Sequence, residues 1–145
     1  MTNDSSVKEN PALVEARVLV VDDNPSDRLL IKTILIKLGI KNLQEAENVK
    51  SAAFKLQTAF DVAKPFDLVI LDWNMPGKSG FEFLKEIRGQ KDTNKTPVIM
   101  VTSVTEADKI RDSLRMGVDD FVIKPVQIAL LADKVNKLLM SFKKA

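Results

Sequence analysis

Short apolar runs alternate with longer amphipathic stretches along most of this chain. The runs are rich in Val, Ile and Leu, are too short for helices and end at polar residues, as buried β-strands do. They lie at residues 17–21, 67–71, 97–101 and 119–123, with a weaker candidate at 43–46. The intervening stretches carry apolar residues at helical spacing. The first of these begins at the N-cap Asn24 and ends at Gly39, and the others span residues 49–60, 80–88, 105–116 and 127–142.

The alternation predicts an α/β fold. Strands that are apolar throughout, rather than at every second residue, are covered on both faces, which requires helices on each side of a parallel sheet. Right-handed crossovers then leave few topologies. We expect a flavodoxin-like (βα)5 doubly wound parallel five-stranded sheet with strand order 2-1-3-4-5. In the second helix, Ala52, Ala53, Leu56 and Phe60 are expected to face the core.

Length and local polarity predict one domain. A chain of 145 residues can bury a core without disulfides or a structural metal. Residues 1–15 are polar and are expected to form a flexible N-terminal tail, leaving residues 16–145 as the folded domain. The first ten residues contain no apolar segment typical of a secretory signal, and no apolar run could cross a bilayer. The sequence therefore predicts a cytoplasmic protein without membrane insertion.

The residue types that are missing restrict the chemistry. The chain has no Cys and no His, which excludes thiolate and imidazole metal sites and Ser-His or Cys-His catalysis. Its chemistry must come from carboxylates, hydroxyls and lysines. A net charge of +2, with both signs mixed along most segments, gives no basic footprint for nucleic acid. We therefore expect no nucleic acid partner.

Complementary polar residues stand where the predicted strands end. Asp22 and Asp23 follow the first strand and Asp72 follows the third, while Thr102 and Lys124 follow the fourth and fifth. The carboxyl ends of parallel strands meet at one edge of an open sheet, where such folds bind ligands. The sequence thus predicts a site with three carboxylates, one hydroxyl and one ammonium.

This set of groups suits phosphoryl transfer to a carboxylate. Clustered carboxylates repel one another, and their oxygen atoms favour a hard cation such as Mg²⁺, or Mn²⁺. Asp72 ends the central strand and is the candidate nucleophile, while Thr102 and Lys124 could stabilise phosphoryl oxygens. Ser103 is small enough to leave a phosphoryl group a path to Asp72. Taken singly, each residue also has a purely structural interpretation, and Phe121 is more typical of a core.

With these motifs the chain resembles the CheY-like receiver domain of two-component response regulators, over about residues 16–143. The matching positions are the acidic pair Asp22-Asp23, Asp72, Thr102 and the Lys124-Pro125 pair. The string DWNMP at residues 72–76 is particularly similar to the single-domain chemotaxis regulator.

The resemblance implies a role for each matching residue. Asp72 is the phosphoacceptor, and Asp23, Asp72 and the Asn74 carbonyl are Mg²⁺ ligands, with Asp22 reaching the metal through water. Thr102 and Lys124 hold the phosphoryl group. Lys124-Pro125 is expected to be a cis peptide. Phe121 matches the switch aromatic, although it is Phe rather than Tyr.

The implied function is that of a stand-alone response regulator receiver, not a true enzyme beyond self-phosphorylation from a phosphodonor and slow autodephosphorylation. The donor is a histidine kinase or a histidine phosphotransfer protein. The signal reaches a downstream protein target through the face formed by the last two helices and the strand between them. The alternatives are a phosphorelay intermediate, a receiver-like scaffold, a flavin-binding protein suggested by topology alone, and a phosphatase of the haloacid dehalogenase type. That phosphatase family expects an acid where this chain has Asn74.

Overall fold

Five parallel strands form one sheet in the computed structural model, which describes residues 10–144 and leaves residues 1–9 and 145 outside the described part. The strand order is β2-β1-β3-β4-β5, which confirms the predicted doubly wound, flavodoxin-like topology. Neighbouring strands are parallel throughout. The strands are β1 (Arg17–Val21), β2 (Asn42–Ala46), β3 (Leu68–Leu71), β4 (Val98–Thr102) and β5 (Asp120–Ile123).

Helices connect the strands and begin where the sequence supplies caps. The Asn24 side chain accepts a hydrogen bond from the Asp27 N–H at the start of α2, and Ser79 and Glu82 form a capping box at the start of α4. None of the helices within residues 10–144 combines the length and the apolar content needed to cross a membrane. The helices are α1 (Pro11–Val14), α2 (Pro25–Lys37), α3 (Val49–Asp61), α4 (Gly80–Gly89), α5 (Ala107–Arg115) and α6 (Ile128–Lys144).

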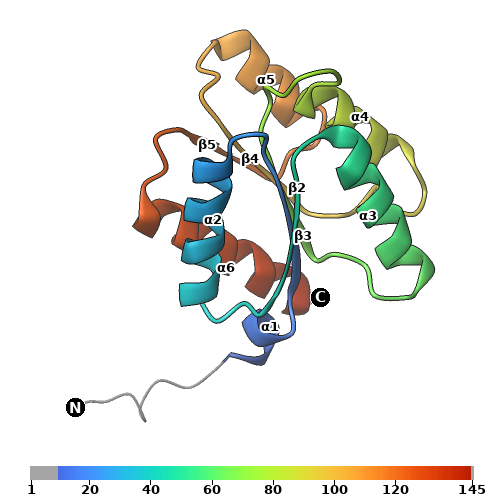
Figure 1. Ribbon diagram of the computed structural model, residues 1–145, viewed down its shortest axis with the longest axis vertical. Coiled ribbons are helices and arrows are strands. Elements are labelled where there is room, and N and C mark those ends of the chain that lie inside the picture. The colour runs from blue at the N-terminus through green and yellow to red at the C-terminus, as the bar shows by residue number, and fades with distance from the viewer. Residues whose placement is uncertain (1–9, 145) are drawn as a thin grey trace.

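Two apolar cores lie on opposite faces of the sheet, because successive residues of a strand point to opposite sides. In β1, Leu19 and Val21 pack in the core covered by α3 and α4. Val18 and Val20 pack in the core covered by α1, α2 and α6. Figure 1 shows the sheet between these two helical layers. The continuous apolar strands are therefore explained by burial on both faces.

The strand register brings the polar residues that follow the strands to one edge of the sheet. Val21 is paired with Leu71, and Leu71 with Met100. Thr102, the last residue of β4, is paired with Ile123 of β5. The residues after β1 and β3 consequently emerge side by side, and those after β5 emerge at the same edge of the sheet, beyond β4.

The structure differs from the prediction at the N-terminus. Residues 1–15 were expected to be a flexible tail; residues 1–9 lie outside the described part, but Pro11–Val14 form α1. The Asn10 side chain caps this helix by accepting from the Ala12 N–H, and Leu13 is buried with only 7% of its surface exposed. The Asn10-Pro11 pair starts a short helix as Asn24-Pro25 does, and Leu13 reaches the core formed with α2 and α6.

One expected core residue of α3 is exposed. Phe60 was expected to face inward, but 40% of its surface is accessible. Ala52 and Leu56 are buried as predicted, and Ala59 is buried in place of Phe60. These residues are spaced by four and three positions and share one helix face, whereas Phe60 lies about 100° further round the helix.

Candidate functional site

The backbone places the acidic residues at the carboxyl edge of the sheet. The Asp22 N–H donates to the Ala46 oxygen at 3.1 Å, and the Asp72 N–H donates to the Val21 oxygen at 3.0 Å. On the other side, the Lys124 N–H donates to the Thr102 oxygen at 2.8 Å. These bonds continue the strand ladders by one residue, so the positions of the three side chains are set by the sheet itself.

Three carboxylates converge in this place. Oxygen atoms of Asp22, Asp23 and Asp72 lie within 4.8 Å of one another. Asp22 and Asp72 are nearly inaccessible, at 1% and 5% exposure, whereas Asp23 is exposed. Like charges about 4 Å apart repel by roughly 4 kcal/mol at an effective dielectric near 20. This cluster therefore requires a positive partner.

Lys124 supplies that charge. Its ammonium lies 2.8 Å from Oδ2 of Asp22, 2.8 Å from Oδ2 of Asp27 and 2.9 Å from Oδ2 of Asp72. Burial of the amine favours its neutral form, but the three carboxylate hydrogen bonds outweigh burial and raise the pKa of Lys124 above its ordinary value. The lysine therefore stays protonated at neutral pH.

For Asp22, burial has a larger effect on the pKa than the hydrogen bonds have. Burial disfavours its carboxylate form and raises its pKa, although the hydrogen bonds from Lys124 and from the Asn24 N–H oppose the shift. The Asn24 N–H donates to Oδ1 of Asp22 at 2.9 Å, and the guanidinium of Arg28 donates to the Asp22 carbonyl oxygen at 2.7 Å. Asp22 is thus held in place by its own loop and by the first turns of α2.

The turn after Asp72 is shaped by close backbone contacts. The Asn74 N–H donates to Oδ1 of Asp72 at 3.3 Å, and the Gly80 N–H donates to the Trp73 oxygen at 2.7 Å. A Cβ atom at Gly80 would lie 1.9 Å from the carbonyl oxygen of Asp72, which is far inside van der Waals contact. Gly80 therefore allows the start of α4 to pack against the residue that carries the central carboxylate.

An open pocket adjoins the carboxylates and bears on the metal prediction. Asp23 and Asn74 line it together with Met75, Pro76 and Ser79. Carboxylate and carbonyl oxygens, with space for water, are the donor set that Mg²⁺ prefers. The residues present thus fit a divalent cation held by Asp23, Asp72 and the Asn74 carbonyl, with Asp22 close by.

The remaining predicted residues lie at the end of β4 and in β5 and differ in their burial. Thr102 is completely buried, and its hydroxyl oxygen accepts from the Val104 N–H at 3.4 Å. Ser103, the next residue, is exposed. Phe121 is partly exposed and packs against the core shared with α3 and α4. The Lys124–Pro125 peptide bond is cis, as the resemblance implied.

Sequence reasoning missed two residues of this site. Asp27 was part of a helix start, yet its carboxylate reaches Lys124. Gly80 was only the first residue of a helix, yet it is the contact point with Asp72. A signal existed for Asp27: the first turn of a helix that follows a parallel strand lies over the carboxyl edge of the sheet. The signal for Gly80 requires the packing angle between α4 and β3, which local sequence does not give.

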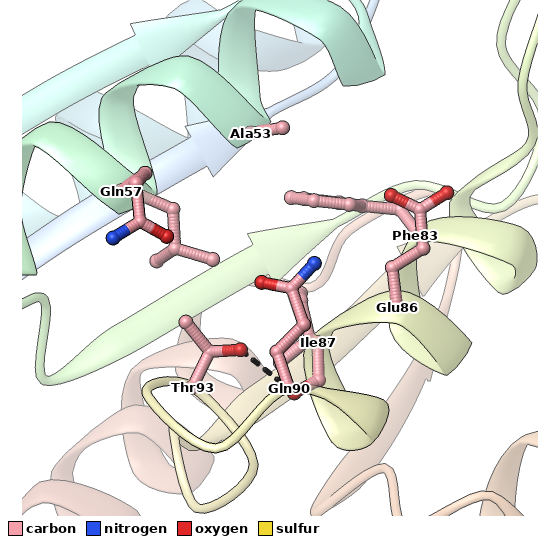
Figure 2. A pocket seen from close by; sticks show the side chains of 8 residues that line it. Ala53, Gln57, Phe83, Glu86, Ile87, Gln90 and Thr93 are labelled. Carbon is pink, nitrogen blue, oxygen red and sulfur yellow. Dashed lines mark hydrogen bonds between the residues drawn. The ribbon is translucent and has the colours of Figure 1, made fainter.

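A second pocket lies away from the carboxylates, between α3 and α4 (Figure 2). Its polar side chains are two amides, one carboxylate and one hydroxyl, and the Thr93 hydroxyl donates to the Ile87 carbonyl oxygen at 2.8 Å. No site residue predicted from the sequence lines it. Its walls are formed by Ala53, Leu56, Gln57, Phe83, Glu86, Ile87, Gln90 and Thr93.

The part of the chain that contains the three carboxylates and Lys124 matches known proteins in sequence. The family model of the response regulator receiver domain matches residues 18–136. The chain belongs to this family. Chemotaxis protein CheY-3 of Vibrio cholerae is 34% identical to this receiver over 122 residues, which cover 84% of this chain and 90% of the relative. Chemotaxis protein CheY of Pseudomonas aeruginosa is also 34% identical, covering 84% of this chain and 94% of the relative.

Solved structures agree with the sequence relatives. The structure of chemotaxis response regulator CheY4 of Vibrio cholerae superposes on this receiver with a TM-score of 0.75 at 32% identity. The match covers 85% of this chain and 98% of the solved one. The family match includes every predicted site residue from Asp22 to Lys124 and begins after α1. The short helix α1 therefore lies outside the residues that the family model matches.

Proposed function

We propose that this receiver accepts a phosphoryl group on Asp72 from a phosphohistidine and signals through altered protein contacts. The observation that carries the proposal is the meeting of Asp72 with both an acidic pair and a lysine. Oxygen atoms of Asp72, Asp22 and Asp23 lie within 4.8 Å of one another, and the Lys124 ammonium is 2.9 Å from Asp72. A carboxylate nucleophile beside a cation site and a fixed ammonium is the arrangement that phosphoryl transfer requires.

The acidic side chains would hold the divalent cation, Mg²⁺ or Mn²⁺. Asp23, Asp72 and the Asn74 carbonyl are the proposed direct ligands, with Asp22 acting through water. Such a cation, when bound, neutralises charge on phosphoryl oxygens. Asp23 and Asn74 line the open pocket beside Asp72, which supports their assignment because an ion and a phosphodonor both need access.

The transfer step needs few protein groups. A carboxylate oxygen of Asp72 attacks the phosphorus atom, and an O–P bond forms as the P–N bond of the phosphohistidine breaks. The electron pair of the broken bond returns to the imidazole nitrogen, which takes a proton from solvent. Lys124 and the hydroxyl of Thr102 stabilise the phosphoryl oxygens, and exposed Ser103 leaves the approach open. Slow attack of water on the acyl phosphate would return Asp72 to its free form.

The proposed output face consists of α5, β5 and α6. Thr102 would move towards the phosphoryl group and leave space for the partly exposed ring of Phe121 to rotate inward. Shifting a population from 1:99 to 99:1 needs about 5.5 kcal/mol of differential stabilisation, more than a few new hydrogen bonds give, so target binding would complete the shift. The relatives named as chemotaxis proteins suggest a chemotaxis pathway, and we propose a cytoplasmic histidine kinase or histidine phosphotransfer protein as donor.

Phosphorylation by acetyl phosphate tests the acceptor. The wild type with Mg²⁺ should gain one phosphoryl group per chain by intact mass, whereas Asp72→Asn should gain none, because an amide cannot form the acyl phosphate. Asp92→Asn is the control, since Asp92 is exposed in the turn before β4, at the opposite edge of the sheet. Stoichiometric labelling of Asp72→Asn would refute the assignment.

A further inference from the structure

Every hydrogen-bond donor of the Lys124 ammonium has a carboxylate acceptor. A lysine ammonium carries three N–H donors. The acceptors are Oδ2 atoms of Asp22, Asp27 and Asp72 at 2.8, 2.8 and 2.9 Å. They come from the loop after β1, the first turn of α2 and the loop after β3. The ammonium therefore joins three separate segments of the chain.

Asp27 differs from the other two acceptors. Asp22 and Asp72 belong to the carboxylate group that could hold a metal ion, and Asp27 does not. Its side chain is 32% exposed, against 1% for Asp22 and 6% for Asp72. Among the three acceptors of Lys124, Asp27 is thus the one outside the carboxylate group that could hold a metal ion.

We propose that Asp27 is a positioning residue, which holds the Lys124 ammonium at the site while its bond to Asp72 is exchanged for a bond to a phosphoryl oxygen. The inference rests on the proposed function, and it assigns to Asp27 a part that neither the family match nor the sequence motifs specify.

The exchange follows from where the charge goes. When Asp72 becomes an acyl phosphate, its carboxylate loses its negative charge, and the charge now lies on the phosphoryl oxygens. Hydrogen bonds between charged groups are about twice as strong as those between neutral groups, so the donor directed at Asp72 turns to the phosphoryl group. The bonds to Asp22 and Asp27 remain. They keep Nζ in place at the end of a flexible four-carbon side chain.

The backbone of Asp27 is held in the cap of α2. Its N–H donates to the Asn24 side-chain oxygen at 3.0 Å, in the cap of α2. Lys124 is fixed at its other end by its backbone bond to Thr102. The ion pair therefore links the start of α2 to the end of β5 and spans the site between them.

A purely structural role for Asp27 makes different predictions. An acidic side chain in the first turn stabilises a helix through the helix dipole, whatever its partner. Asp108 has such a position in α5, is exposed and accepts from the Lys109 N–H. Both α2 and α5 follow a strand and so begin at the carboxyl edge of the sheet. Asp108→Ala therefore removes the same charge from the same edge without touching Lys124.

The first measurement needs neither metal nor phosphodonor. Lysine ammonium protons give ¹H–¹⁵N NMR signals when hydrogen bonds slow their exchange with water, and the Lys124 signal is assigned by its loss in Lys124→Met. In the full-length protein with EDTA, Asp27→Ala should raise the exchange rate of this signal several-fold. Asp108→Ala should leave it unchanged. A general loss of helix stability would not raise the exchange rate of the Lys124 ammonium alone.

The second measurement is the rate of phosphorylation by acetyl phosphate with Mg²⁺. Misplacing a catalytic group by about 1 Å can cost up to about a hundredfold, so a partly freed ammonium should lower the maximal rate of Asp27→Ala about tenfold. The acetyl phosphate concentration at half-maximal rate should change little. Asp27→Asn keeps an acceptor oxygen for Lys124 and should recover most of the rate, and Asp108→Ala should match the wild type.

The outcomes separate this inference from the function on which it rests. If the wild type itself is not labelled, the proposed function and the inference are both wrong. If the wild type is labelled, and Asp27→Ala keeps both its rate and its Lys124 signal, the inference alone is wrong. A phosphorylation rate that rises in both Asp27→Asn and Asp27→Ala would also overturn the inference. That result would mean that the negative charge of Asp27 repels the anionic phosphodonor, and not that Asp27 positions the lysine.

Discussion

The Lys124 ammonium lies 2.9 Å from Oδ2 of Asp72, although 52 residues separate the two in the sequence. The contact depends on two neighbouring strand pairings, β3 with β4 and β4 with β5. Because the lysine is also bonded to Asp22, it offsets part of the repulsion among the acidic side chains before any phosphoryl group arrives. Its position is therefore a property of the resting protein.

Removing the lysine should separate metal binding from activation. We expect Lys124→Ala to bind Mg²⁺ at least as tightly as the wild type, because the variant loses a cation that competes for the carboxylates. Titration of Trp73 fluorescence measures this, since Trp73 is the chain's one tryptophan and follows Asp72. With beryllofluoride as a phosphoryl mimic, the variant should lack the amide NMR shift changes expected in α5, β5 and α6. Exposed Lys91→Ala is the control, and wild-type shift changes in Lys124→Ala would contradict the role of the lysine.

The acidic cluster should cost stability when no cation is bound. Asp23 is exposed, so we expect Asp23→Asn to raise the free energy of unfolding in EDTA by only about 1 kcal/mol, through relief of repulsion with its acidic neighbours. The same variant should lose most of the stabilisation that Mg²⁺ gives the wild type. Urea unfolding with and without Mg²⁺ measures both effects. An equal Mg²⁺ stabilisation in the two proteins would show that Asp23 is not a ligand.

Gly80 should tolerate no side chain. The added Cβ of Gly80→Ala would lie 1.9 Å from the Asp72 carbonyl oxygen, so α4 or the loop after β3 must move. We expect a loss of roughly 2–3 kcal/mol in unfolding free energy, because overpacking outweighs the better helix propensity of Ala. Gly89→Ala is the matched control at the other end of α4, where nothing lies within 4 Å of the new Cβ. Equal stabilities of the two variants in urea would contradict the close contact.

Glu45 should make stability depend on acid pH. Its hydrogen bond from Lys32, at 2.6 Å, and a weaker one from Arg28 lower the pKa of Glu45 below its ordinary value. A carboxyl group with a lowered folded-state pKa stabilises the protein above its unfolded-state pKa, and this contribution disappears as the pH falls. Because the side chain is 40% exposed, we expect Glu45→Gln to cost only about 0.5 kcal/mol at pH 7.

The difference between Glu45→Gln and the wild type should shrink as the pH drops below the ordinary Glu value of 4.5. Exposed Glu47→Gln is the control and should match the wild type at every pH. Urea unfolding across this range measures both variants. A constant difference at all pH values would mean that the effect comes from lost packing and not from the charge.

Local sequence was sufficient for most of the fold. The apolar strands around Val20 and Ile70 needed no tertiary information, because burial on both sides leaves no polar position in them. The Asn24 cap of α2 and the glycine stop at Gly39 are equally local signals. The edge strand β2 was weaker, since its exposed face carries polar residues.

Where local signals competed with packing, sequence reasoning failed. Residues 1–15 were assigned to a tail because most of them are polar and they include Asn10-Pro11, but Pro11–Val14 form α1 and Leu13 is buried. The inward position of Phe60 was wrong because the buried stripe of α3 follows Ala52, Leu56 and Ala59. In both cases, packing against residues distant in the sequence decided which side chain is buried: Leu13 in α1, and Ala59 rather than Phe60 in α3.

The sequence by itself determined which groups stand at the strand ends, because that depends only on where each apolar run stops. It could therefore name Asp22, Asp72 and Lys124 as one site. Only the tertiary structure decided which further residues contact these groups. The approach of the first turn of α2 gives Lys124 the additional acceptor Asp27, and the packing of α4 against the Asp72 backbone requires Gly80. Both contacts depend on distances and angles between helices and strands, and the spacing of apolar residues along the chain does not encode these.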